Sequence, residues 1–384
     1  MRRFRQDYLA GMLLLASWAG RTGSTRATDT LQIKLAPLIE AHEGKVAVAV
    51  KNLKTGESFS HHADVPMPTA SLIKLPIMVE AYRQAEAEKI DLKDMLTLRQ
   101  EDKAPGSGVL TQHFSPGMSL PLVDAIHLMI VYSDNTATNL VLDQIGLPAT
   151  NGAMEKLGLA NTKVHSKVFR GDTSILPERS KEFGLGSTTA GEMVALLEML
   201  DQGKLAGKQG TKDMRRHLAA CEDKRLSRHF PPEIKVLQKT GSVTTVRTVA
   251  GIIELPSGNV AVCVLTNNNK DRRWASDNAG EVLAASIGRI LLEHFQPDWR
   301  TAQAEADLVL RVGSQGKRVE LLQRALNDRS AGSPELNLDG EFGPVTQAAV
   351  VAWQKSQKLP ETGEINAEAW KMLGLSADQY RPLK

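Results

Sequence analysis

The chain has 384 residues, of which 42% are hydrophobic and 24% charged. This ordinary globular composition argues against long disorder, and the length predicts two domains. Removing residues 1–27 would take away five of the 47 basic and one of the 44 acidic residues, leaving 42 and 43. The remaining chain is nearly neutral, so a nucleic-acid partner has no electrostatic support.

Residues 1–27 have the pattern of an export signal. A basic start with paired arginines precedes an apolar stretch, 9–18, that is too short to span a bilayer. Cleavage after Ala19 and after Ala27 both fit, and the paired arginines leave a twin-arginine route open. We therefore expect an exported protein, periplasmic or associated with the cell wall, with no stable membrane span after the signal is removed.

The pattern of apolar residues predicts an α+β fold for the larger domain, placed at residues 28–300. Alternating or continuous apolar runs predict strands early and late in this region, at 46–52, 58–61, 235–238, 245–255 and 260–266. Spacings of three and four predict helices at 121–157, 190–200 and 277–295. Strands from both ends with helices between them favour one antiparallel sheet packed against a helical layer. A polar connector at 299–307 follows, with the domain boundary near 305.

The cysteines and histidines predict no metal site and no cofactor. Cys221 and Cys263 are the only cysteines, which excludes a disulfide framework. A single bridge between them and two free thiols both remain open. The histidines show no spacing typical of zinc ligands.

A serine and a lysine at helical spacing form the first candidate catalytic pair. Ser71 and Lys74 open a predicted helix, and a separation of three places both side chains on one face. Serine needs a neighbouring base, and a lysine in a partly dry site can lose its proton near neutral pH. The same spacing recurs at Ser314 and Lys317, so the pair alone is weak evidence.

Two further motifs strengthen the first pair. Ser133-Asp134-Asn135 follows it, and Lys239-Thr240-Gly241-Ser242 comes later at a strand end. This order is the set found in class A β-lactamases and penicillin-binding proteins. A second copy of the middle motif, 276–278, follows Lys239 and begins the last helix, so we interpret Ser276 or Asp277 as a helix N-cap.

With these motifs, residues 31–295 resemble the class A β-lactamase and penicillin-binding-protein superfamily. Segments 103–108 and 188–193 match the class A pattern as well. The resemblance implies that Ser71 attacks the carbonyl, Lys74 takes part in proton transfer and Ser133 relays a proton to the leaving nitrogen. It further implies backbone amides of Ser71 and Ser242 as the oxyanion hole, and a substrate-binding set of Asn135, Lys239, Thr240 and Gly241.

The sequence departs from the family in the loop before Thr188. Most class A enzymes carry there a glutamate and, four residues later, an asparagine that activate the deacylating water, and this chain has no asparagine at that spacing. Glu178 follows a proline and is our candidate base, against an ordinary ion pair with Arg179 or Lys181. Two other acidic residues of the loop are weaker rivals, Asp172 and Glu182.

Arg247, on a predicted strand, allows two interpretations. It either binds a substrate carboxylate or is a solvated strand charge.

Residues 306–375 resemble the small three-helix peptidoglycan-binding module of wall enzymes. Gly313-Ser-Gln-Gly316, Leu338-Asp-Gly-Glu-Phe-Gly343 and Thr362-Gly-Glu-Ile365 carry the resemblance. Short helices broken by Asp-Gly and Phe-Gly turns predict a small all-α core, in which Trp353 and Trp370 are buried. The alternative is a helical extension without a ligand.

Three functions follow from these expectations. The first is a class A-like serine β-lactamase held near the wall, which acts on β-lactams. The second is a D-alanyl-D-alanine carboxypeptidase, which acts on acyl-D-Ala-D-Ala stem peptides. The third is a wall-binding protein whose hydrolase domain has decayed. The first is favoured because its matches run through the whole larger domain, and the complete acylation set disfavours the third.

Overall fold

The structure is a computed structural model that describes residues 24–299, 309–329 and 335–375. Most of the predicted export signal, residues 1–23, lies outside the described residues, and so does most of the predicted connector. The described chain divides into two compact units; the larger runs to residue 290 without 230–233. No helix in the described part is long and apolar enough to cross a membrane.

A five-stranded antiparallel sheet forms the frame of the larger unit. Its order is β2-β1-β10-β9-β8, so the two early strands pair with three late ones. The bounds are β1 Lys45–Asn52, β2 Ser58–His61, β8 Val236–Val243, β9 Val246–Ile253 and β10 Val260–Asn267. The predicted strand at 235–238 is thus the start of a longer strand that contains the Lys239 motif. The α+β prediction is confirmed.

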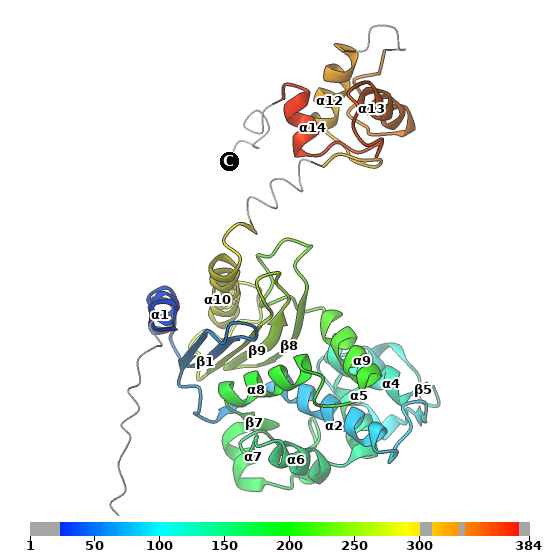
Figure 1. Ribbon diagram of the computed structural model, residues 1–384. Coiled ribbons are helices and arrows are strands. Elements are labelled where there is room, and N and C mark those ends of the chain that lie inside the picture. The colour runs from blue at the N-terminus through cyan, green and yellow to red at the C-terminus, as the bar shows by residue number, and fades with distance from the viewer. Residues whose placement is uncertain (1–23, 300–308, 330–334, 376–384) are drawn as a thin grey trace, which may run out of the picture. The chain divides into compact units, whose positions relative to one another are not determined.

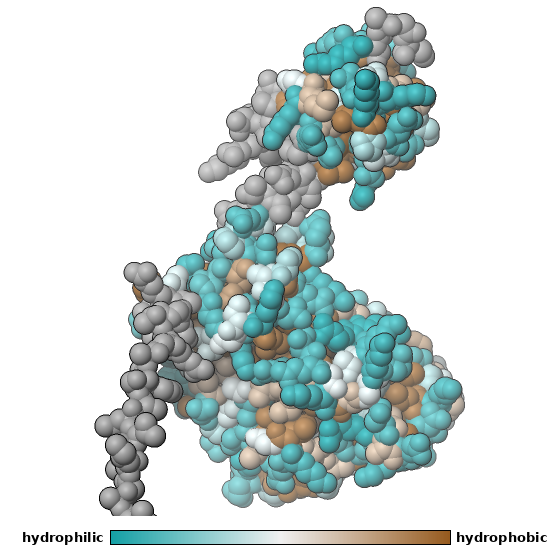
Figure 2. Space-filling model, viewed as in Figure 1, coloured by the Kyte–Doolittle hydropathy of each residue, from teal (hydrophilic) through white to brown (hydrophobic). Residues whose placement is uncertain are grey.

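Helices cover both faces of this sheet. Figure 1 shows α1, Ser24–Glu40, and α10, Ala279–Phe295, on one face, and α8, Ala190–Asp201, on the other. Every residue of β9 is buried, as expected for a strand covered on both sides. The face seen in Figure 2 is mostly hydrophilic, because the apolar residues lie inside.

A helical layer packs beside β8. The predicted run 121–157 consists of three helices, α4 Leu122–Val131, α5 Asn135–Ile145 and α6 Leu147–Lys156, which pack with α2, Lys74–Glu86. The remaining helices of the larger unit are α3 Leu110–His113, α7 Pro177–Phe183 and α9 Lys208–Ala219, with 3-10 turns η1 Ala70–Ile73, η2 Gln100–Asp102 and η3 Gly171–Thr173. Short strands complete it: β3 Met67–Pro68, β7 Gly186–Thr188 and β6 Lys163–Val164 in one sheet, and β4 Met95–Thr97 with β5 Ser119–Pro121 in another.

The smaller unit holds a separate helical core. Its helices are α12 Lys317–Asn327, α13 Pro344–Ser356 and α14 Ala367–Met372. Trp353 and Trp370 are 6% and 2% exposed and pack with Val319, Leu322, Leu326 and Val350. The prediction that both tryptophans belong to the core is confirmed.

Candidate active site

The nucleophile segment is a strained 3-10 turn under β8. Ala70, directly before Ser71, has a positive φ of 46°, which non-glycine residues rarely adopt. Thr248 on β9 donates its hydroxyl to the Thr69 carbonyl at 2.8 Å and so ties the turn to the sheet. Ser71 lies at the wall of a cleft of about 960 Å³.

Lys74 is a fully buried amine one turn from Ser71. Its Nζ donates to the Ser133 carbonyl at 2.6 Å, to Ser133 Oγ at 3.2 Å and to Asn135 Oδ1 at 2.8 Å. Burial, and then the nearby Lys239 charge, hold the pKa of Lys74 well below its ordinary value, although Asp134 acts the other way. A dry amine with a lowered pKa can accept a proton from a neighbouring hydroxyl.

The Ser133 motif stands at the start of α5. Asp134 is the N-cap, because its carboxylate accepts from the backbone N–H of Ala137 at 2.8 Å. Its second oxygen accepts from the amides of Val109 and Leu110 at 2.7 and 2.9 Å, which fastens the residues directly after the 103–108 segment to this helix. Ser133 itself has a φ of 54°. The motif is therefore held by its backbone as well as by its side chains.

Lys239 completes the group around Ser133. Its Nζ donates to Ser133 Oγ at 3.1 Å and to the Thr240 carbonyl at 2.8 Å. Burial lowers the pKa of Lys239. Ser133 Oγ thus lies between two buried amines, a position from which it can pass a proton.

Gly241 allows β8 to lie directly on the nucleophile turn. A Cβ at this position would come within 2.5 Å of the Thr69 carbonyl oxygen and 2.7 Å of the Leu72 nitrogen. Only glycine fits this approach of two backbones. Ser71 and Ser242 therefore line the same cleft, together with Asn135, Lys239 and Thr240.

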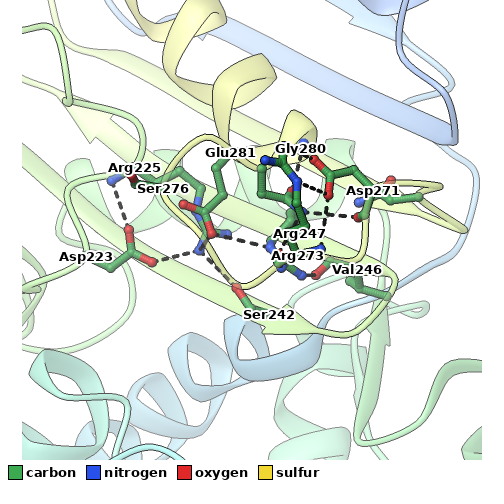
Figure 3. Close-up of polar contacts among 12 residues, drawn as sticks. Asp223, Arg225, Ser242, Val246, Arg247, Asp271, Arg273, Ser276, Gly280 and Glu281 are labelled. Atoms are coloured by element: carbon green, nitrogen blue, oxygen red, sulfur yellow. Dashed lines mark hydrogen bonds and ion pairs between the residues drawn. The ribbon is translucent and has the colours of Figure 1, made fainter.

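Two buried arginines share one carboxylate beside Ser242, as Figure 3 shows. Arg225, 3% exposed, donates to Ser242 Oγ at 2.9 Å and to Asp223 at 2.8 Å, and lies 3.5 Å from Glu281 Oε1. Arg247 pairs with the same oxygen at 3.3 Å. Arg225 lines the cleft, whereas Arg247 is not among the lining residues.

Arg247 is not the solvated strand charge that the sequence allowed, because the residue is 1% exposed. Its guanidinium donates to the carbonyls of Val243, Val246 and Arg273 and stacks on the Trp274 ring at 4.8 Å. Carboxylate binding by Arg247 stays a prediction.

The sequence missed Arg225, which supplies a guanidinium at the cleft wall. It lies outside the motifs in a loop between α9 and β8, and no local pattern distinguished it from its charged neighbours. Only the folded chain brings it to Gly241 and Thr248, whose carbonyls accept from it at 3.2 and 3.1 Å.

Glu178, the predicted water-activating base, is not among the residues that line the cleft. Its side chain is 85% exposed and pairs with Lys181 at 2.8 Å, the alternative considered above. The rivals Asp172 and Glu182 are exposed too, and none of the three lines the cleft. Glu178 lies in the first turn of α7, where its charge faces solvent.

The second copies of the motifs have structural roles. Lys317 is 72% exposed and pairs with Glu320 at 2.7 Å, whereas Lys74 is fully buried. In the copy at 276–278 the helix cap is one residue later than predicted, because Asn278 Oδ1 accepts from the Gly280 amide at 3.0 Å. Cys221 and Cys263 are both free and buried.

The fold and the order of the motifs define a class, the serine acyl-enzyme hydrolases that include β-lactamases and penicillin-binding proteins. Residues 30–295 match the model of the β-lactamase enzyme family, and the chain belongs to this family. Residues 315–373 match the model described as "Putative peptidoglycan binding domain".

Several proteins that are similar to this chain are named β-lactamases. β-Lactamase L2 of Stenotrophomonas maltophilia is 27% identical over 211 residues, 52% of this chain and 66% of its own length. A β-lactamase structure from Sphaerobacter thermophilus is 32% identical, with a TM-score of 0.62 over 69% of this chain and 97% of that one. The structure of PBP-A, 22% identical, shares the fold with a TM-score of 0.61 over 70% and 96%. The chain spans 45% to 66% of the length of curated relatives from Klebsiella oxytoca, Proteus vulgaris and S. maltophilia.

Proposed function

We propose that the chain is an exported, class A-like serine β-lactamase that opens β-lactam amides through an acyl-enzyme on Ser71. The observation that carries the proposal is the position of Ser133 Oγ, within 3.2 Å of Lys74 and 3.1 Å of Lys239 at the cleft that Ser71 lines. This arrangement supplies a nucleophile, a dry base and a proton relay in one place.

Acylation proceeds by proton transfer within this group. Lys74 accepts the Ser71 hydroxyl proton as Oγ attacks the lactam carbonyl, and the backbone amides of Ser71 and Ser242 stabilise the oxyanion. The carbon–nitrogen bond then breaks. Ser133 gives its proton to the leaving nitrogen and regains one from the Lys74 ammonium, which restores the neutral amine.

The cationic end of the cleft suits the carboxylate that β-lactams carry beside the lactam nitrogen. Lys239 contributes positive potential, Thr240 offers a hydroxyl, and Arg225 reaches this end through its contact with Ser242 at 2.9 Å. We assign to Arg225 the binding of the substrate carboxylate, a role that the sequence suggested for Arg247.

Deacylation has no base from the loop before Thr188. Among the described lining residues the carboxylates are Glu222, Asp223 and Glu281, all from other segments. We therefore assign water activation to Lys74 and expect deacylation to be the slow step. The same observation favours a second candidate, a D-alanyl-D-alanine carboxypeptidase, because a penicillin-binding peptidase acylates with these groups but turns β-lactams over slowly.

The smaller unit is proposed to hold the enzyme at peptidoglycan, in the periplasm or at the cell wall. A β-lactamase-family unit joined to a match for a peptidoglycan-binding domain indicates an extracytoplasmic protein. Sedimentation of the full chain with insoluble peptidoglycan tests this part. Its failure would leave the acylation proposal unaffected.

A chromogenic cephalosporin distinguishes the two enzyme functions. The β-lactamase proposal predicts many ring-opened products per molecule of full-length protein, and none with Ser71→Ala. A stoichiometric burst without turnover, together with D-alanine release from an acyl-D-Ala-D-Ala peptide, would establish the peptidase. Absence of any Ser71-dependent burst would refute both.

A further inference from the structure

The backbone at the cleft is strained at one residue outside the acylation motifs, Phe169. Three non-glycine residues that line the cleft have positive φ angles: Ala70 at 46°, Ser133 at 54° and Phe169 at 56°. The first two hold the nucleophile turn and the proton relay. For a bulky residue such as phenylalanine this conformation is unfavourable, and it persists only where surrounding contacts enforce it.

The contacts that enforce the turn at Phe169 come from α5. Asn139 binds both backbone groups of Val168: its Oδ1 accepts from the amide at 2.8 Å, and its Nδ2 donates to the carbonyl at 3.1 Å. The Arg170 amide donates to the Lys167 carbonyl at 3.2 Å and closes the turn. Phe169 is therefore mounted rigidly on the helix that also begins with the Ser133 motif.

Within the described part of the larger unit, the ring of Phe169 is left uncovered. Phe169 is 67% exposed although it is large and apolar, and it lines the cleft. The ring lies beside Gly106, where a Cβ would be 3.4 Å from a ring carbon. A Cβ at position 106 would be in ordinary van der Waals contact with the ring but only 2.9 Å from Asn135 Nδ2, so a larger residue here would press on Asn135.

Phe169 and the buried cations reach the cleft from different segments. Lys239 and Arg225 lie beside Ser242, whereas Phe169 comes from the loop before β7 and contacts the 103–108 segment. The two cations that flank Phe169, Lys167 and Arg170, pair with Asp143 and Asp172. β-Lactams and acyl-D-Ala-D-Ala peptides carry a carboxylate on the nitrogen side of the scissile amide and an acylamino substituent on the other. When the carboxylate meets Lys239 and Arg225, the acyl substituent points away from these cations, and we expect it to lie towards the loop that carries Phe169.

We propose that Phe169 is a specificity-determining residue that selects substrates with an apolar, preferably aromatic, acyl substituent. The inference rests on the proposed function, since it assumes acylation of Ser71. The rigid turn already fixes the Phe169 ring, so the ring loses little conformational freedom when a substrate binds. It can therefore stack on, or make apolar contact with, a second ring at a small entropic cost.

Two penicillins that differ only in the acyl group test the proposal. Benzylpenicillin carries a phenylacetyl group, and 6-aminopenicillanic acid carries none. The full chain is incubated with each, and the rate constant of Ser71 acylation is followed by intact mass. We expect Phe169→Asn to reduce the preference for benzylpenicillin about tenfold, with little change for 6-aminopenicillanic acid. Asparagine accepts the left-handed conformation, so the turn is kept.

Two further variants separate stacking from structure. Phe169→Tyr keeps the ring and should retain the preference. Trp274→Ala removes another exposed aromatic of the cleft, at the cationic end, and should leave the ratio of the two rates unchanged. An unaltered ratio in Phe169→Asn would overturn the inference while the proposed function stands. If the wild-type chain acylates with neither compound, the proposed function fails and the inference fails with it.

Discussion

The two sides of the cleft are built differently. On the motif side, Lys74 and Lys239 are fully buried and meet at one serine hydroxyl. On the loop side, Asp172 and Glu178 are 69% and 85% exposed and pair with neighbours two and three residues away. A buried charge is constrained by its partners, whereas an exposed ion pair contributes little and holds no fixed direction. Buried groups of the core therefore supply acylation, whereas the exposed carboxylates of the loop do not supply deacylation.

The largest effect should come from breaking the motif side. Lys74→Met removes the base, and we expect acylation to fall about 10⁴-fold or more, as when one member of a catalytic group is lost. The measurement is the burst rate with a chromogenic cephalosporin. Lys317→Met is the matched control, because this lysine has the same spacing from a serine but is exposed. Equal loss in both variants would contradict the assignment.

Acylation should also fail as pH decreases through the lowered pKa of Lys74, because the ammonium cannot accept the Ser71 proton. Burial is the main cause of this lowered pKa. The test is the pH profile of the burst rate, which should rise towards alkaline pH to a plateau. A flat profile at low pH would contradict a lysine base.

A methyl group at Gly241 should separate the sheet from the nucleophile turn. Gly241→Ala places a Cβ against backbone atoms at 2.5 and 2.7 Å, so one of the two segments must move. We expect about a 10²-fold loss of acylation, since small displacements at a reacting group have costs of this size. Gly152→Ala, in α6 with open space around it, should keep full activity. Normal acylation by Gly241→Ala would argue against the close approach.

A buried histidine outside the cleft should make stability depend on pH. His217 is fully buried. It is hydrogen-bonded to Tyr82 Oη at 2.7 Å and to His127 Nδ1 at 2.9 Å. Burial lowers its pKa to about 4 from 6.5, and His127 and Arg216 act in the same direction while Asp213 opposes them. The unfolded chain therefore binds more protons between these values, so stability decreases as pH falls from about 6.5 to 4.

The size of this loss is at most about 3 kcal/mol at 1.36 kcal/mol per pKa unit. Denaturant unfolding between pH 7 and 4 should show a shallower decrease in His217→Gln than in the wild type. The exposed His113 provides the control, since His113→Gln should leave the slope unchanged. The same slope in all three proteins would refute a neutral buried His217.

The smallest effect is expected on the loop side. Glu178→Gln removes a solvent-exposed charge, so steady-state turnover should change less than about twofold. Progress curves with the chromogenic cephalosporin measure this. A collapse of turnover in this variant would restore Glu178 as the base.

The sequence predicted the motif side well, for a physical reason. Helical spacing predicts that Ser71 lies near Lys74 without knowledge of the rest of the fold. The apolar pattern predicts a strand at 235–238, which the structure extends through Lys239. Arg225 and Glu281 were missed because their meeting depends on how a loop and α10 pack against β9. The exposure of Glu178 could not be predicted, because adjacency to a proline says nothing about which way a carboxylate faces.

We infer that neither acylation of Ser71 nor hydrolysis of the acyl-enzyme uses a carboxylate from the loop before Thr188. Rapid-quench intact-mass measurements on the wild-type chain and on Asp172→Asn/Glu178→Gln/Glu182→Gln, both with benzylpenicillin, test it most directly. The account predicts that a Ser71-linked adduct forms in a stoichiometric burst and decays slowly, at the same rate in both proteins. Fast decay in the wild type and a long-lived adduct in the triple variant would contradict it.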